Sequence, residues 1–328
     1  MILSVIISAY NLENFIGECI ESLMLDSDCY ELIVVDDGSS DKTAQVIKQF
    51  SNSNSQVKYF YQENKGVGAA RNLGLSKADG EYVWFVDGDD FINTVQFSKA
   101  LQIVKNSEED VLSFGFDLVD EAGRKHDWLN LKPVFEKSIS MSGEQFYLQN
   151  LRFNYVWQFI IRKDLLLKNN ITFLTPYKMQ DAAFFPRLMY HATLVKTIDL
   201  ILVNYRQRLN SAVNSINPSD RHFFYLSMLE VANSVQRFRD KLKENSSFKN
   251  GLEKAIDRFN QMLFLDFISS DFDMEKESQL YKMLKSYGFF PFKRITGFTT
   301  KMNLKLNFYR SICNTNPLFF KKIYRIIN

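Results

Sequence analysis

Cysteine, proline and long apolar runs are all scarce in this chain of 328 residues. The three cysteines, Cys19, Cys29 and Cys313, show no metal-binding spacing and do not pair evenly, so we expect a reducing compartment. Six prolines and a hydrophobic share of 46% indicate a folded protein and argue against a disordered one. No apolar run reaches the length of a membrane span, so the sequence predicts no transmembrane helix.

Two further absences argue against a signal peptide and against a histidine metal site. Residues 1–9 are apolar but lack a basic segment and a cleavage site, which predicts a strand and not a signal peptide. The three histidines, His126, His191 and His222, have no ligand spacing, so none is assigned to a metal site.

Acidic residues are missing from one end of the chain. Residues 278–328 contain ten Lys/Arg and no Asp/Glu, which leaves residues 1–277 with a net charge of −8. A helix over residues 319–327 would carry Lys321, Lys322 and Arg325 on one side and aromatic and aliphatic residues on the other. This pattern predicts a basic amphipathic tail on an anionic membrane surface; packing against the same chain or a second subunit stays open. Nucleic acid is not expected, because no recognised binding module accompanies the charge.

Strand and helix patterns alternate over the first two thirds of the chain. Apolar runs predict strands, and helical spacing of apolar residues predicts the helices between them. Short polar turns join them, so the fold class is α/β with a doubly wound, mostly parallel sheet of the nucleotide-binding type. Longer helical patterns follow, which predicts a first region over residues 1–215 and a helical second region over 216–328. The strands are expected at 3–9, 31–35, 57–61, 82–86 and 200–205, and the helices at 13–25, 43–50, 69–76, 223–242 and 251–269.

Carboxylates follow two of these strands. Asp36 and Asp37 end one strand, and a D-x-D motif, Asp87 and Asp89 with Asp90 beside it, ends another. Ligands bind at the carboxyl ends of strands in open α/β sheets, and carboxylate oxygens suit Mg²⁺ or Mn²⁺ on a phosphate. The motif alone also fits a solvated acidic turn.

The glycines in this region exclude two common nucleotide motifs. Gly66 and Gly68 form a Gly-x-Gly that lacks the Lys-Ser/Thr of a P-loop and the third glycine of a dinucleotide fingerprint. The sequence therefore favours a nucleotide site of another kind.

Four segments in order resemble the inverting family 2 glycosyltransferases of the GT-A fold, of the bacterial surface-polysaccharide type. They are SVIISAYN (4–11), IVVDDGSSDKT (33–43), ENKGVGAARNLGL (63–75) and GEYVWFVDGDD (80–90). Residues 157–162, 171–173 and 180–184 resemble the family's acceptor-side segment, with Gln180-Asp181 in place of its usual Glu-Asp pair. Residues 205–208 and Ser211 resemble its closing Tyr-Arg-x-Arg-x-x-Ser stretch. The resemblance covers roughly residues 1–215.

The resemblance implies an enzyme that moves a sugar from a nucleotide diphosphate donor, uridine-linked, to a hydroxyl of a glycan or lipid-linked acceptor. It implies Mn²⁺ or Mg²⁺ as cofactor and a cytoplasmic location, peripheral on the inner face of the cell membrane. The donor sugar, the acceptor and self-association are not specified by the sequence.

The resemblance also assigns roles to single residues. Asp181 becomes the general base, Asp89 and Asp87 the metal ligands, and Trp157 and Gln180 part of the acceptor or sugar pocket. The nucleotide contacts are Ser8, Tyr10, Asp37, Arg71, Asp87 and Arg208.

Several of these residues also fit a structural role. Asp181 could cap a helix, Trp157 could be core, and Arg71 could be a helix-surface arginine. Tyr10 could be a half-buried aromatic at a strand end, and Arg208 could belong to a solvated loop.

Two rival functions remain. A sugar nucleotidyltransferase would need a glycine-rich basic loop after the first strand, and residues 8–11 (Ser-Ala-Tyr-Asn) are not one. A catalytically silent, membrane-associated partner in a glycan-assembly complex would have no need for Asp37, Asp87, Asp89 and Asp181.

Overall fold

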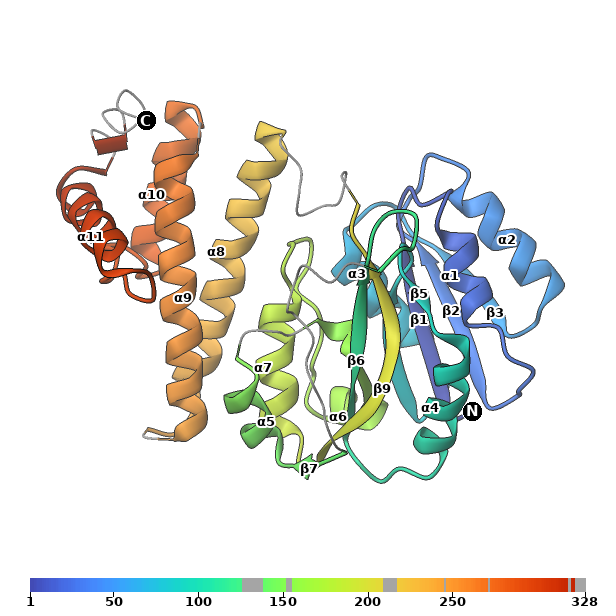
Figure 1. Cartoon of the computed structure of the whole chain (residues 1–328). Helices are drawn as coiled ribbons and strands as arrows, with labels where there is room; N and C mark the ends of the chain where they lie inside the picture. The colour runs from blue at the N-terminus through green and yellow to red at the C-terminus, as the bar shows by residue number, and fades with distance from the viewer. Residues whose placement is uncertain are drawn as a thin grey trace. The chain divides into compact units, whose positions relative to one another are not determined.

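The computed structural model describes residues 1–125, 138–151, 155–208, 217–244, 246–270, 272–317 and 320–321. It contains two compact units, Met1–Ser211 and Ala212–Asn328. Each unit is built around its own set of elements (Figure 1). The sequence pattern predicts the boundary between the two regions slightly later in the chain, after residue 215.

The first unit is organised around one mixed sheet with the strand order β3-β2-β1-β4-β8-β6-β9-β5, and β7 pairs with β9. The pairs β1–β2, β1–β4, β2–β3 and β6–β9 are parallel. The pairs of β8 with β4 and β6, and of β9 with β5 and β7, are antiparallel. This confirms the mostly parallel α/β fold. The strands are β1 Leu3–Ala9, β2 Tyr30–Asp36, β3 Val57–Tyr61, β4 Tyr82–Asp87, β5 Phe91–Ile92, β6 Val111–Val119, β7 Ser140–Met141, β8 Phe159–Arg162 and β9 Val195–Arg206.

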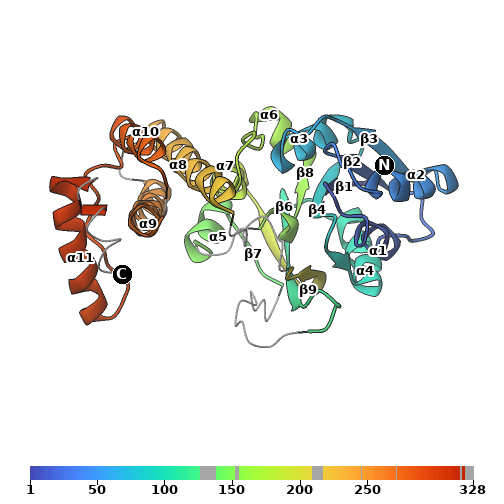
Figure 2. The same cartoon turned by 90° about the horizontal axis from the view of Figure 1, so that it is seen from above.

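Helices cover both faces of this sheet, as a doubly wound fold requires. Figure 2 shows α1 and α4 on one side of the central strands and α3 and α6 on the other. On the α1/α4 side, Trp84 and Phe97 belong to one buried cluster with alternate residues of β1 and β2. The helical elements of the unit are α1 Ile16–Ser22, α2 Thr43–Ser53, α3 Val67–Lys77, α4 Thr94–Lys105, α5 Gly143–Gln149, a 3-10 turn at Val156–Gln158, α6 Lys163–Lys168 and α7 Asp181–His191.

The first helix is shorter than its pattern predicts. It begins at Ile16 and has no side-chain cap, because the preceding residues bind the start of α2. The Leu12 N–H donates to Thr43 Oγ1 at 2.7 Å, and the Glu13 N–H donates to an Asp41 carboxylate oxygen at 3.1 Å. Residues 10–15 therefore form a loop tied to the neighbouring strand–helix turn.

The second unit is helical. Tyr225, Leu263 and Phe264 are fully buried in it, and the Tyr225 hydroxyl donates to the Leu263 carbonyl at 3.1 Å. In the described part of the chain, no helix combines the length and the apolar character that crossing a bilayer requires. The helices are α8 Pro218–Asp240, α9 Ser247–Ser269, α10 Met274–Ser286 and α11 Thr300–Thr315.

The expected basic tail is described only at Phe320 and Lys321; its other positions, including Lys322 and Arg325, lie outside the described residues. Lys321 is fully buried, and its ammonium nitrogen lies 2.8 Å from Glu277 Oε1 and 2.7 Å from Ser270 Oγ. The prediction that Lys321 faces lipid is therefore wrong. Its charge instead stabilises a buried carboxylate inside the second unit.

Candidate active site

Three strand ends meet at one edge of the sheet. In the register of β1 with its neighbours, Ala9 pairs with Asp36 and Ser8 pairs with Asp87. The Ser8 hydroxyl lies 3.4 Å from Asp87 Oδ1. The two acidic strand ends therefore lie on either side of β1, where ligands bind in open α/β sheets.

A buried arginine joins this edge to the start of α7. Arg71, on α3, is only 3% exposed. Its Nη2 lies 2.7 Å from Asp87 Oδ1, and its Nη1 lies 2.7 Å from Asp181 Oδ1. The other Asp181 oxygen accepts the Val156 N–H at 3.1 Å. Both oxygens of Asp181 are thus fixed in direction, and one guanidinium bridges two carboxylates that are 94 residues apart in the chain.

Asp181 is the first residue of α7. Burial raises the pKa of its carboxyl above the ordinary aspartate value, and so does the charge of Asp87, while Arg71 opposes the rise. A carboxylate with a raised pKa beside the acidic strand ends suits proton abstraction, since it is a stronger base than a solvated aspartate.

Segments 173–176 and α3 fit closely against each other beside this bridge. The Asn72 amide donates to the Phe173 carbonyl and accepts the Phe173 N–H, both at 2.9 Å. Gly68 permits this approach, since a side chain there would come within 2.5 Å of the Leu174 carbonyl oxygen. Sequence reasoning assigned no role to Asn72, although it follows Arg71 directly.

Asp37 organises the turn before α3. One of its oxygens accepts from Gln62 Nε2 at 2.6 Å and the Lys65 N–H at 2.9 Å, and the other accepts the Gly66 N–H at 2.8 Å. A carboxylate offers about four acceptor positions, so these bonds leave about one for a base N–H. Asp36 is structural: it accepts the Ser39 N–H at 2.9 Å and the Tyr59 hydroxyl at 3.2 Å.

The D-x-D acids follow β4. Arg208 donates from Nε and Nη2 to Asp89 Oδ2, at 2.7 and 2.5 Å. Burial and the charge of Asp87 raise the pKa of Asp89, and Arg208 opposes the rise. Burial and the charges of Asp89 and Asp87 raise the pKa of Asp90 well above its ordinary range. The cluster therefore carries more negative charge than its surroundings readily stabilise.

Arg206 differs from Arg208 in its surroundings. Arg206 is 6% exposed. Its backbone N–H donates to Asp90 Oδ1 at 2.8 Å, and its side-chain Nε donates to the Asp89 carbonyl at 2.9 Å. Nη1 donates to the Glu121 carbonyl and Nη2 to Glu18 Oε2, both at 2.6 Å. These bonds make Arg206 a structural link between β9, α1 and the D-x-D turn. The family resemblance assigns the nucleotide contact to Arg208 and not to Arg206, and no sequence pattern points to Glu18.

The remaining predicted residues lie in different environments. Tyr10 is 48% exposed at the end of β1, which leaves its ring accessible to a nucleobase. Trp157 is 2% exposed, stacks on Tyr155 at 4.9 Å between ring centroids, and packs in the core rather than lining an open pocket. Gln180 is 4% exposed and precedes the first turn of α7. Ser211 lies outside the described residues.

The acids at this edge fit a divalent cation that also binds a diphosphate. Among the described residues, no three His, Cys, Asp or Glu side chains converge into a protein-only metal cage. One or two carboxylates are what Mg²⁺ or Mn²⁺ commonly takes from a protein when the substrate supplies further oxygens, and Asp87 and Asp89 would be the residues to hold it. Asp90 Oδ2 is buried and bonds to no described residue, which agrees with the raised pKa of this carboxyl.

Sequence comparison assigns the family. Residues 4–169 match the model described as glycosyl transferase family 2. The chain belongs to the family 2 glycosyltransferases. An uncharacterized glycosyltransferase, EpsJ of Bacillus subtilis, is 29% identical over 215 residues, which cover 64% of this chain and 62% of EpsJ. Poly(ribitol-phosphate) β-N-acetylglucosaminyltransferase TarS of Staphylococcus aureus is 31% identical over 193 residues, which cover 57% of this chain and 32% of TarS. The matches thus span less than two thirds of either relative.

Solved structures show the same fold. Residues 1–349 of S. aureus TarS in complex with UDP-GlcNAc align with a TM-score of 0.70 and 22% identity, covering 99% of this chain and 92% of that one. The mannosyltransferase PcManGT from Pyrobaculum calidifontis, in complex with GDP-Man and Mn²⁺, aligns with a TM-score of 0.51 and 15% identity over 96% of this glycosyltransferase and 87% of that chain. At these identities the comparison establishes the fold alone.

Proposed function

We propose that this chain is an inverting, metal-assisted glycosyltransferase that moves a sugar from a UDP-sugar to a hydroxyl of a glycan or lipid-linked acceptor. The observation that carries the proposal is the Arg71 bridge. The guanidinium lies 2.7 Å from Asp87 on the donor side and 2.7 Å from Asp181 on the acceptor side. A donor sugar next to Asp87 would therefore present its anomeric carbon close to a positioned base. The UDP-GlcNAc complex of TarS supports a uridine-linked donor.

Asp181 removes the proton from the acceptor hydroxyl. The acceptor oxygen forms a bond to the anomeric carbon while the bond from that carbon to the diphosphate oxygen breaks, and the electron pair leaves with UDP. Displacement in line inverts the anomeric centre. The bonds from Arg71 and Val156 keep the Asp181 carboxylate from turning away, which favours the reactive geometry.

The leaving diphosphate needs positive charge. Asp87 and Asp89 would hold a divalent cation, which when bound would offset the charge that develops on the diphosphate. Arg208 is the second source, since its planar guanidinium suits phosphate oxygens. At the base end, the exposed Tyr10 ring would stack on uracil, and Asp37 would accept a base hydrogen bond. Ser8, whose hydroxyl lies 3.4 Å from Asp87, would contact the nucleotide from β1.

Release of UDP from a panel of UDP-sugars tests this function, with Mn²⁺ and with a chelator. We expect slow UDP release with Mn²⁺ for one or a few donors, and loss of this release in EDTA and in Asp89→Asn. Asp199→Asn, an exposed acid on β9, is the matched control and should behave as wild type. Full activity in excess EDTA would refute the metal assignment.

The same assays separate the rival functions. A silent partner protein would release no UDP from any donor. A sugar nucleotidyltransferase would instead release pyrophosphate from a nucleoside triphosphate and a sugar phosphate.

A further inference from the structure

The last described helix, α11, has its polar side turned toward its own unit. Asn303, Asn307, Arg310 and Asn314 fall within an arc of about 60° by helix geometry, and all four bind the segment 292–298. Asn307 accepts the Ile295 N–H at 2.9 Å and donates to its carbonyl at 2.8 Å. Asn314 does the same for Phe292, at 2.8 and 3.0 Å, while Arg310 donates to the Phe292 carbonyl and Asn303 to the Phe298 carbonyl, both at 2.9 Å.

These bonds fix the rotation of α11 about its axis. Leu306 and Cys313 are buried on the neighbouring part of the same side, so apolar packing and hydrogen bonding select one orientation. The opposite side of the helix must therefore face away from the segment 292–298.

That opposite side carries large apolar residues, whereas the outer side of a surface helix usually carries polar ones. Leu304 is 70% exposed and Phe308 is 63% exposed, and Ile312 continues the same line at a spacing of four residues. Phe298, just before the helix, is 46% exposed. Large apolar side chains gathered in this way, rather than scattered singly, mark a surface with a binding partner.

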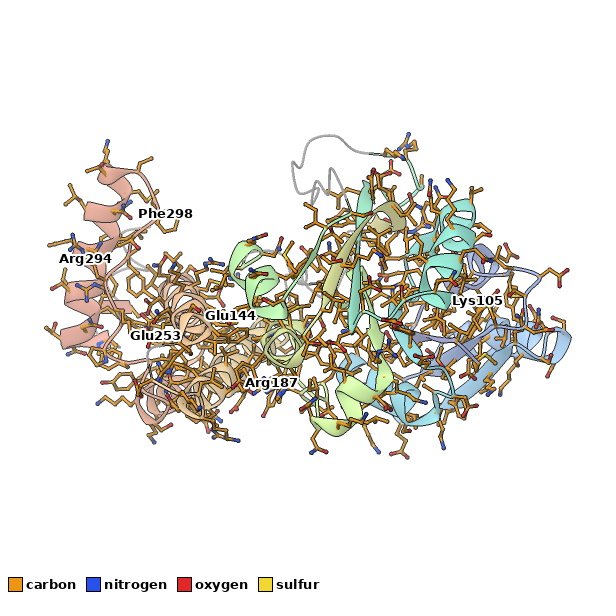
Figure 3. The ribbon with its side chains drawn as sticks, turned by 90° about the horizontal axis from the view of Figure 1, so that it is seen from below. Lys105, Glu144, Arg187, Glu253, Arg294 and Phe298 are labelled. Atoms are coloured by element: carbon orange, nitrogen blue, oxygen red, sulfur yellow. The ribbon has the colours of Figure 1, made fainter. Side chains whose placement is uncertain are left out.

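Cations lie among these apolar residues. Lys301 and Lys305 fall within the same arc of about 100° as Leu304 and Phe308, and Arg294 is exposed on the segment that leads into the helix. Figure 3 labels Arg294 and Phe298 beside α11. None of the three cations forms an ion pair with a carboxylate in the described part of the chain, in contrast to Lys293, which pairs with Asp257 at 2.6 Å. Residues 278–328 supply no acid at all.

We propose that this α11 surface, made of Leu304, Phe308, Lys301, Lys305, Phe298 and Arg294, docks on the surface of an anionic lipid bilayer. The apolar side chains enter the boundary between headgroups and acyl chains, and the cations bind the lipid phosphates. This combination is what a helix lying in a membrane interface requires. The proposed lipid contact thus lies on α11 and not at the chain end, where Lys321 is buried. It is independent of the proposed reaction.

The charge pattern favours lipid over a second copy of this chain. In a twofold dimer the same patch meets itself, so Lys301 and Lys305 would approach their own counterparts without a carboxylate to separate them. An anionic bilayer offers the opposite charge and an apolar phase at the same surface.

Sedimentation of the full chain with vesicles tests the proposal. Vesicles of phosphatidylcholine alone are compared with vesicles that also contain phosphatidylglycerol. We expect binding to the anionic vesicles to exceed binding to the neutral ones by about tenfold or more, and to weaken with added salt. Lys301→Glu with Lys305→Glu should reduce binding by about tenfold or more. Leu304→Gln with Phe308→Gln should remove the part of the binding that survives high salt.

The matched control is Lys99→Glu with Lys105→Glu on α4. These lysines are exposed and form no ion pair within the described residues, and the pair of changes alters the net charge equally. Unchanged binding in this control supports the α11 surface. An equal loss in both pairs would show that overall charge, not α11, drives binding. Wild-type dimers that dissociate in the Leu304/Phe308 variant, with no vesicle binding, would assign the surface to self-association and overturn the proposal. Thermal unfolding and circular dichroism establish that each variant is folded.

Discussion

Arg208 binds Asp89 through two nitrogens, with Nε 2.7 Å and Nη2 2.5 Å from the same carboxylate oxygen. Each side chain is about one-fifth exposed, at 19% and 20%. The proposed metal ligand therefore already has a cation beside it. A metal ion that binds Asp89 must share or replace this contact, whereas a diphosphate offers Arg208 an alternative partner.

Replacing Arg208 should strengthen metal binding and weaken catalysis. We expect Arg208→Ala to raise the affinity for Mn²⁺ without donor by about fivefold, since a partly exposed ion pair contributes about 1 kcal/mol. Turnover should fall, because the leaving diphosphate loses a cation. Titration of Mn²⁺ by electron paramagnetic resonance measures the first effect. Arg239→Ala, which removes an ion pair with Asp240 in the second unit, is the control. Weaker Mn²⁺ binding in Arg208→Ala would contradict this competition.

Replacing the proposed base should affect turnover far more than donor binding. Asp181→Asn keeps the shape of the side chain but cannot take a proton, so turnover should fall by about 10²–10⁴. The affinity for UDP should stay within about threefold of wild type, because the base acts on the acceptor. Calorimetry with UDP, beside transfer rates, separates the two effects. A loss of UDP binding in this variant would place Asp181 in the nucleotide site instead.

The Arg71 bridge predicts a pH effect. Burial raises the pKa of Asp181, and Arg71 opposes that rise. The active form is the ionised carboxylate, so turnover should fall as the pH falls through this pKa. Arg71→Lys keeps a charge but cannot bridge Asp87 and Asp181, so the pKa of Asp181 should rise and the acid limb of the profile should move to higher pH. If the acid limb of the pH profile of turnover stays in place or moves to lower pH, Arg71 does not control the ionisation of Asp181.

The two arginines at the end of β9 should differ in their effect on stability. Arg206→Met removes a buried guanidinium that donates to the Asp89 and Glu121 carbonyls and pairs with Glu18, so the free energy of unfolding should fall by about 2–4 kcal/mol. Arg208→Met should cost less than about 1 kcal/mol, because that ion pair is partly exposed. Urea unfolding of both variants measures the difference. Equal losses would mean that Arg208 also has a structural role.

The buried lysine of the second unit gives a separate stability test. Lys321→Met removes the ammonium group that lies 2.8 Å from the Glu277 carboxylate, which is 5% exposed, so the free energy of unfolding should fall by about 3–5 kcal/mol. Adding Glu277→Leu removes the buried charge and should restore much of the loss. Lys276→Met, which removes an exposed pair with Asp273, should change little. If the double variant is no more stable than Lys321→Met, the charge of Glu277 is not the cause.

The parts of the fold that depend on local pattern could be predicted from the sequence. The β1, β2, β3 and β4 strands are continuous apolar runs, and a parallel sheet buried on both faces requires such runs. Their carboxyl ends must then share one edge, and the observed register of Ser8 with Asp87 agrees. β6 and β8 were not predicted as strands.

The contacts within the candidate site could not be predicted in the same way. Arg71 and Asp181 are 110 residues apart, and Arg206 and Glu18 are 188 apart. No periodicity relates residues at such separations. Trp157 shows the same limit, since its type suits a sugar pocket as well as a core, and only its packing against Tyr155 and Phe116 distinguishes them. Lys321 was placed on a basic helix face because its buried partner, Glu277, lies in another helix.

The bonds around Arg206 limit how far Arg208 can travel. Arg206 is bonded to Glu121 in the turn after β6, to Glu18 on α1 and to the D-x-D turn, so the backbone is anchored two positions before Arg208. Two residues of extended chain span about 7 Å at most, and the arginine side chain adds its own length. Arg208 can therefore exchange one anion for a neighbouring one by changing rotamer, a local motion that is faster than collective motions of about microseconds to milliseconds. Such an exchange would not limit the rate of turnover, and the slow step would lie elsewhere in the cycle.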